Sequence, residues 1–314
     1  MSRCLLIINP SSGGGRAKPH IVKTEWELEN LFDHLEIRFT HKADDAMRYA
    51  EAAVHDGIDA IFCMGGDGTI NETVCGIARA GGRHVKFGFI PVGTCNDMCR
   101  ALGIPKSPKK AIKMLKHAKL RRIDIGRCNN RYFCNNIAAG IIPRILEEVT
   151  PREKEILGPL AYFLRGGQAL FSTKDYTFHI KTENEDLHMR SPLVLALLTN
   201  VVSGFERFMP TASVDDGYMR IVVFKEYYIL NVLRIMPLII SGSIYNSDFV
   251  RIIKCRKADI SIEEKAVLPT NMDGNEGPEL PVSLEVLPQY LQVYVPNRDT
   301  NKDKNQNQKT ALEK

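Results

Sequence analysis

The sequence lacks several features that would assign it to a large class of proteins. No apolar run approaches the ~18 residues that a helix needs to cross a bilayer, and the run at Cys4–Ile8 is too short for a secretory signal peptide. Its eight cysteines are scattered and include no CxxC pair, which suits reduced thiols in a cytosol. There is no internal repeat. These absences favour a cytoplasmic globular protein.

Length and hydrophobic patterning predict two domains. A chain of 314 residues is long for one core. Residues 1–123 alternate strand and helix patterns, which predicts an α/β domain with a mostly parallel sheet. Residues 124–290 contain mainly strand patterns joined by short turns, which predicts a β-rich sandwich domain. Residues 291–296 form a final strand expected to return to the first domain, and the polar residues 297–314 are expected to be a disordered tail.

Individual elements follow from the same patterns. Helices are predicted at residues 44–54 in the first domain, and at residues 154–170 and 228–243 as insertions in the second. Strands are predicted at residues 37–40, 131–137, 178–181, 193–198, 219–224, 259–262, 282–286 and 291–295.

A glycine-rich turn carries an acidic residue after a buried strand. The apolar run Ala60–Cys63 leads into Met-Gly-Gly-Asp-Gly-Thr-Ile-Asn-Glu at residues 64–72. Glycine lets the backbone approach a ligand closely, with N–H groups free for phosphate oxygens. Thr69 and Asn71 are predicted to cap the following helix, whose positive end also favours phosphate. Taken alone, the turn is equally compatible with an ordinary strand-to-helix connection.

Two further turns favour the ligand-binding interpretation. The strand pattern at 87–92 is followed by Gly-Thr-Cys-Asn-Asp at 93–97, and the run Leu5–Ile8 leads into Asn9–Gly15. Because the carboxyl ends of parallel strands lie together, the three turns should line one crevice. The chain has no Walker A pattern, so residues 66–72 are the expected phosphate cradle.

These two motifs resemble those of the soluble bacterial diacylglycerol kinases and their lipid kinase relatives, including sphingosine kinases. The first motif is shared with NAD kinases and 6-phosphofructokinases. The second, which continues into Arg100, Leu102 and Gly103, is more specific. Further similarity lies at residues 124–126, 210–217, 273–274 and 281–291, so the resemblance covers nearly the whole chain except its tail.

The resemblance implies an ATP-dependent lipid kinase that uses Mg²⁺. ATP would be bound by the positions that match the family's nucleotide site: Asn9, Thr40, Gly66, Asp67, Gly68, Thr69, Ile70, Asn71, Glu72 and Thr94. Magnesium would be held through water by Asp67, Asp97 and Asp124. A second, structural Mg²⁺ would be held by Asp216 with the carbonyls of Ser213 and Tyr218. The alternatives are a helix cap for Asp97, a turn former for Asp124 and a plain hairpin at 215–217.

The resemblance also implies a catalytic base. Asp273 matches the aspartate of the family's Asp-Gly-Glu motif, but Asn275 stands where the family has glutamate, and Glu276 follows it. An amide can neither take a proton nor hold negative charge beside a base. Either catalysis is less efficient, or Glu276 supplies the carboxylate. Without the resemblance, Asp273-Gly274 would be interpreted as a hairpin turn.

A basic segment follows the second motif. Residues 106–122 hold eight lysines and arginines and no acid, and a helix is predicted there with Ala111, Ile112, Leu115 and Ala118 on its buried face. The lysines either form a solvated face or attract anionic lipid head groups, at about 1 kcal/mol per residue. Nucleic acid is disfavoured because no aromatic residues interleave with the charges.

The sequence therefore predicts a cytoplasmic kinase, peripheral at the membrane, whose partners are ATP, a membrane lipid and an anionic membrane surface, and leaves a homodimer open. Diacylglycerol, giving phosphatidic acid, is the expected substrate. The alternatives are phosphatidylglycerol, a sphingoid base or a polyprenol. A NAD kinase is a weaker alternative, and Asn275 also allows a non-catalytic lipid-binding regulator with the same fold.

Overall fold

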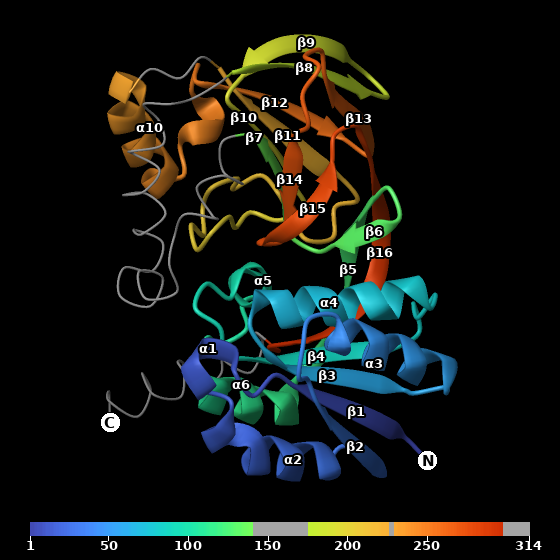
Figure 1. Cartoon of the computed structure of the whole chain (residues 1–314). Helices are drawn as coiled ribbons and strands as arrows, with labels where there is room; N and C mark the ends of the chain where they lie inside the picture. Colours follow the sequence, from blue (N-terminus) through green and yellow to red (C-terminus); the bar gives the residue numbers. More distant parts are fainter. Residues whose placement is uncertain (141–174, 226–228, 298–314) are drawn as a thin grey trace, which may run out of the picture.

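The computed structural model describes residues 1–140, 175–225 and 229–297 (Figure 1). The predicted helix at 154–170 and nearly all of the predicted tail lie outside these residues. Within them, no helix is both long and apolar enough to cross a bilayer. The predicted architecture, an α/β domain followed by a β-rich sandwich, is confirmed.

The first domain is built on a parallel sheet. Its strands, in sheet order, are β2 (His34–Phe39), β1 (Arg3–Ile8), β3 (Ala60–Gly65) and β4 (Lys86–Pro91). The three inner strands are almost wholly buried, as expected when helices cover both faces of a parallel sheet. One face carries α3 (Asp45–His55) and α4 (Asp67–Arg79), and the opposite face carries α2 (Ile21–Glu29) and α6 (Pro108–Met114) (Figure 1). Helix α4 therefore lies between the sheet and the second domain.

Short elements connect these strands and helices. They are α1 (Ser12–Gly15), a 3₁₀ turn at Lys18–His20, α5 (Asp97–Leu102) and a 3₁₀ turn at Leu115–His117.

The second domain is a sandwich of two sheets. The six-stranded antiparallel sheet contains, in order, β12 (Val250–Cys255), β11 (Met219–Phe224), β10 (Leu193–Leu197), β7 (Asn136–Gly140), β14 (Pro269–Met272) and β15 (Asn275–Glu279). The facing layer contains β13 (Lys257–Ile262), β8 (Tyr176–Thr182) and β9 (Asp186–Ser191). Phe133, Phe178 and Met219 are among the buried side chains between the layers. Helix α10 (Ile229–Ser241) and a 3₁₀ turn at Ile244–Asn246 complete the domain.

Two strands run from one domain into the other. Strand β5 (Lys119–Cys128), which also pairs with β6 (Arg131–Phe133), lies antiparallel to the 14-residue β16 (Val282–Val295). Strand β16 pairs with β13 in the sandwich, and its residues Gln292 and Val293 pair in parallel with β4. The expected domain boundaries at 123 and 290 both fall inside these strands. The two domains are thus joined by a continuous β-ribbon.

Three local predictions are wrong. Thr69 and Asn71 do not cap α4, because the helix already begins at Asp67 with Gly66 as its N-cap. The basic helix ends at Met114, and residues 119–122 lie on β5, where pairing with β16 overrides the local helical pattern. The strand predicted at 131–137 is two strands, β6 and β7.

Candidate active site

Two glycine turns pack against each other at the carboxyl ends of β3 and β4. A Cβ placed on Gly93 would lie 2.6 Å from the Cα of Gly66, and one on Gly66 would lie 3.3 Å from the Cα of Gly93. Any side chain at Gly93 would therefore force the two turns apart. The Gly66 N–H donates to the hydroxyl of Ser12 (3.0 Å), from the third predicted turn. The three turns expected to share a crevice do meet.

Asp67, the first residue of α4, joins the two glycine turns through its side chain. Its two carboxylate oxygens accept hydrogen bonds from the backbone N–H groups of Asn96 and Asp97, both at 2.8 Å. The side chain thus caps α5 from a neighbouring helix, which stabilises its charge next to the positive end of α5. Burial nevertheless raises the pKa of Asp67 above its ordinary value.

Asp97 brings a second buried carboxylate to the same place. It accepts the Gly204 N–H (2.8 Å) and the amide of Asn135 (3.3 Å). Burial, followed by the nearby Asp67 charge, raises the pKa of Asp97 to about 6. A buried carboxylate whose proton affinity is raised by a neighbouring carboxylate is a natural site for a cation.

The donor chemistry at these carboxylates fits magnesium. Asn96 places a buried side-chain carbonyl oxygen here that has no hydrogen-bond partner among the described residues. The Asp67 and Asp97 carboxylates line the cavity and, like the Asn96 carbonyl, offer oxygen, the ligand atom that Mg²⁺ prefers. Asp124 lies elsewhere: it does not line the cavity, and it accepts the N–H groups of Gly217 (2.6 Å) and Gln289 (2.8 Å) near the β5–β16 ribbon.

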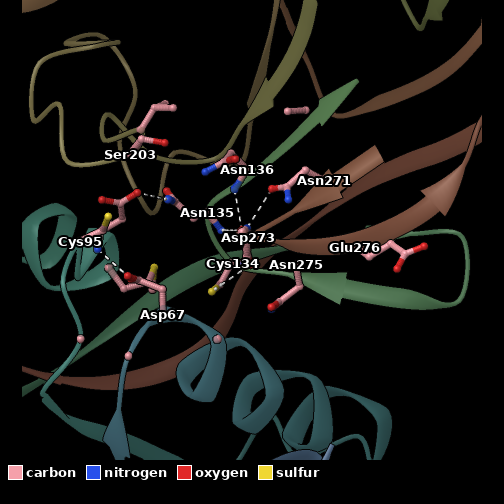
Figure 2. A pocket seen from close by; sticks show the side chains of 18 of the residues that line it. Asp67, Cys95, Cys134, Asn135, Asn136, Ser203, Asn271, Asp273, Asn275 and Glu276 are labelled. Atoms are coloured by element: carbon pink, nitrogen blue, oxygen red, sulfur yellow. Dashed lines mark hydrogen bonds between the residues drawn. The ribbon is translucent and has the colours of Figure 1, made fainter. Parts of the chain in front are cut away.

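Asp273 lies opposite Asp67, on the turn between β14 and β15 (Figure 2). Its carboxylate is held by five donors. They are the backbone N–H groups of Cys134 (2.7 Å), Asn135 (2.9 Å) and Asn136 (2.7 Å), the Asn71 amide (2.6 Å) and the Cys134 thiol (3.3 Å). Its backbone is left-handed, with φ of 50°. Burial raises the pKa of Asp273, and the hydrogen bonds oppose that rise.

Asn135 connects the carboxylates of the two domains. Its backbone N–H donates to Asp273, while its side-chain amide donates to Asp97, and its side-chain oxygen accepts the hydroxyl of Thr199. Every polar group of the Asn135 side chain is therefore engaged, which fixes its orientation. The turn that this residue occupies, between β6 and β7, was predicted as continuous strand, so Asn135 was missed. The run Cys134-Asn135-Asn136 interrupting an apolar strand pattern is the signal that could have revealed it.

A cavity of about 450 Å³ separates these groups. Asp67, Asp97 and Asp273 all line it, together with Gly66, Gly68, Thr94 and Asn135. A second cavity of about 210 Å³ lies on the other side of the first turn of α4 and is lined by Asn9, Thr40, Thr69 and Glu72. The volume of the first is typical of a small-molecule site.

Most predicted nucleotide residues therefore line one of two neighbouring cavities, and two do not. Ile70 is fully buried in the first domain's core. Asn71 is buried and donates to Asp273 of the second domain. Its position on α4 makes it a link between the domains.

The two residues after Gly274 diverge. The Asn275 side chain turns toward the glycine turn of α4, where a Cβ on Gly68 would lie 3.7 Å from its amide nitrogen, whereas Glu276 turns away from Asp273 (Figure 2). Alternation along β15 places them on opposite faces. Both residues line the cavity, and the one directed toward the glycine turn that carries Asp67 is the amide rather than the carboxylate.

Comparisons with known proteins agree with this arrangement. The model of the diacylglycerol kinase catalytic domain matches residues 3–128, and that of the YegS C-terminal NAD kinase beta sandwich-like domain matches residues 135–295. A diacylglycerol kinase of Staphylococcus aureus (strain bovine RF122 / ET3-1) is 33% identical over 301 residues, which cover 96% of this chain and 95% of that protein.

Solved structures show the same fold. A candidate diacylglycerol kinase from Bacillus anthracis superposes with a TM-score of 0.80 at 25% identity, covering 95% of this chain and 98% of its own. A second structure, of a diacylglycerol kinase from the same bacterium, superposes with a TM-score of 0.72 at 23% identity and the same coverage. The matching catalytic-domain model and the diacylglycerol kinase relative define the class of the protein as a kinase. The chain belongs to the diacylglycerol kinase family.

Proposed function

We propose that this protein transfers the γ-phosphoryl group of ATP to the hydroxyl of diacylglycerol, giving phosphatidic acid and ADP. The observation that carries the proposal is the cavity in which Asp67 and Asp97, on two interlocked glycine turns, face Asp273 across the domain junction. The names of the relatives favour a lipid over NAD as the acceptor.

The nucleotide would lie along the start of α4. The two cavities flank this helix, and its first turn contributes residues to both. The positive end of the helix and the backbone of the glycine turn favour phosphate there. Asp67 and Asp97 would hold Mg²⁺, which when bound offsets the negative charge of the phosphates.

Asp273 would accept the proton of the lipid hydroxyl. The lipid oxygen forms a bond to the γ-phosphorus, the bond from that phosphorus to the bridging oxygen breaks, and ADP leaves. Since Asp273 already has five donors, the incoming hydroxyl must displace one. The Cys134 thiol is the weakest donor of the five, so it is the group that the hydroxyl would replace.

The test is incubation of the purified protein with γ-labelled ATP, Mg²⁺ and mixed micelles, each holding diacylglycerol, phosphatidylglycerol, a sphingoid base or a polyprenol. We expect label in phosphatidic acid. Label in another product would change the substrate, and transfer to none would favour a non-catalytic lipid-binding regulator.

The base assignment needs its own variants. Asp273→Asn keeps the shape of the side chain and should lower turnover by about a hundredfold to ten-thousandfold, with ATP affinity unchanged. Asn275→Glu should raise turnover only when Asp273 is present. Full activity of Asp273→Asn would show that another group takes the proton, and loss of activity in Glu276→Gln would identify Glu276 as that group.

A further inference from the structure

A buried arginine on β11, Arg220, contacts the preceding loop 211–218, where the family resemblance implies a structural metal ion. The Arg220 side chain is 5% exposed. Its guanidinium pairs with both carboxylate oxygens of Asp216, and it also donates to the backbone carbonyls of Tyr218 (3.2 Å) and Thr211 (2.8 Å). A planar fork that meets a carboxylate at two points is among the strongest polar contacts that a protein forms.

These contacts use the ligands that a metal would need. The implied ion would be held by the Asp216 carboxylate and the carbonyls of Ser213 and Tyr218. The Arg220 guanidinium occupies both oxygens of the Asp216 carboxylate and also donates to the Tyr218 carbonyl. The neighbouring Asp215 is also engaged, because it accepts the Ser213 hydroxyl (2.6 Å) and the Arg121 guanidinium (2.9 Å).

A divalent ion and the guanidinium cannot share this place. Magnesium requires near-octahedral oxygen ligands at short distance. An ion at Asp216 would have to displace a bidentate guanidinium, and the freed arginine would remain buried beside a second positive charge. The residues present therefore do not fit the ion.

We infer that in this chain the Arg220 guanidinium takes the place of the structural divalent ion, so that the loop 211–218 is held by protein contacts alone. Any divalent requirement of the protein then belongs to Asp67 and Asp97.

The loop matters because it supports the ribbon between the domains. The Asp124 N–H donates to the Val214 carbonyl (2.7 Å), and the Asp124 carboxylate accepts the N–H groups of Gly217 in the loop and Gln289 in β16. Asp124 therefore ties the loop to both crossing strands. Because the guanidinium is part of the chain, it cannot dissociate as an ion can. The contacts between the loop and the two crossing strands would therefore persist at any magnesium concentration.

The first experiment counts bound ions. Mn²⁺, a probe for divalent sites that prefer oxygen, is titrated into nucleotide-free protein and the free ion is measured by electron paramagnetic resonance. We expect Asp216→Asn to bind as many ions as the unaltered protein, and Asp97→Asn to bind one fewer. Loss of one ion in Asp216→Asn would overturn the inference, because it would show that Asp216 holds a metal despite Arg220.

The second experiment removes the guanidinium. Arg220→Met leaves the half-buried Asp216 carboxylate without its partner. We expect the urea midpoint of this variant to fall in EDTA and to recover with Mg²⁺, and we expect one additional Mn²⁺ to bind. Arg121→Met is the matched control: it removes the guanidinium from Asp215, which is more exposed, and should gain no ion. If Arg220→Met does not fold, the double variant Arg220→Met/Asp216→Asn, which leaves no unpaired charge, replaces it and should fold without Mg²⁺. If the urea midpoint of Arg220→Met is the same in EDTA and in Mg²⁺, the inference is contradicted.

Discussion

The hydrogen bond between Asn71 and Asp273 gives the sharpest test of how the two domains hold the site. Asn71 lies on α4 of the first domain and is 5% exposed, and its amide donates at 2.6 Å to a carboxylate in the second domain. Asn71→Ala should therefore remove an interdomain contact. The four other donors to Asp273 come from residues 134–136, within the second domain's own turn.

The size of the effect follows from the charge and burial of the acceptor. Hydrogen bonds to charged groups contribute about 1.5–3 kcal/mol. Since four donors stay in place, we expect the lower half of that range, so the free energy of unfolding should fall by about 2 kcal/mol. The affinity for ATP should change little, because the Asn71 side chain donates to Asp273 and lines neither of the two cavities.

The assay is urea unfolding followed by tryptophan fluorescence. The chain has one tryptophan, Trp26 on α2, so its emission reports on the first domain. A double-mutant cycle with Asp273→Asn measures the coupling, which we expect to reach about 1–2 kcal/mol for residues in direct contact. Thr73→Ala is the control, because the Thr73 hydroxyl bonds only to groups of the first domain, the Thr69 carbonyl and the Cys63 thiol.

Two outcomes would refute this reasoning. If Asn71→Ala and Asp273→Asn add to within about 0.5 kcal/mol, the contact does not couple the domains. If Asn71→Ala weakens ATP binding and leaves stability unchanged, Asn71 is a nucleotide ligand, as the motif at 64–72 suggests.

Three further predictions concern the charged groups. Asp67→Ala should abolish phosphoryl transfer while the protein still unfolds cooperatively, with a loss of about 1 kcal/mol for the missing α5 cap; unchanged turnover with normal magnesium dependence would contradict it. Burial and Asp67 raise the pKa of Asp97 from 3.8 to about 6, so the stability gained by holding its proton is complete below pH 3.8 and is lost as the pH rises through about 6. Asp97→Asn in EDTA should therefore be more stable than the unaltered protein at pH 7.5, by about 3 kcal/mol, and the difference in urea unfolding should shrink toward pH 5; a difference independent of pH would show that the carboxylate is not the cause. The exposed lysines of α6 are Lys109, Lys110 and Lys113. Replacing all three by glutamine should weaken sedimentation with anionic vesicles at low salt but not at high salt. Equal vesicle binding by the variant and the unaltered protein would show that these lysines only form a solvated face.

Lys116 is kept in that last variant for a structural reason. Its ammonium lies 3.6 Å from the Glu27 carboxylate and 5.1 Å from the centre of the Trp26 ring, so it contacts α2. Changing it would mix a packing effect with the loss of membrane attraction.

The fold was predictable where the pattern in the sequence is local. The runs Ala60–Cys63 and 87–92, each followed by a glycine turn, predicted strands of a parallel sheet and a shared crevice, and both follow from steric and hydrogen-bonding rules within a few residues. The patterns at 193–198 and 219–224 likewise predicted buried strands of the second domain.

What the sequence could not supply are contacts between distant segments. Residues 119–122 continue a helical pattern and yet lie on β5, because β16 pairs with them from more than 160 residues away. The donors to Asp273 lie 137–202 residues away, so no local pattern connects them. Arg220 is separated from Asp216 by only four positions, but nothing in the sequence shows that the Arg220 side chain is buried and pairs with Asp216.

The β5–β16 ribbon also constrains how the protein is made. During synthesis β16 emerges after every other described strand, yet it is the neighbour of β4 in the first domain's sheet. Until β16 has been synthesised, one edge of β4 in the nascent first domain therefore remains unpaired. An open apolar strand edge of this kind favours association with other chains. Chaperone dependence and poor yield are the expected behaviour of any fragment that ends before residue 282.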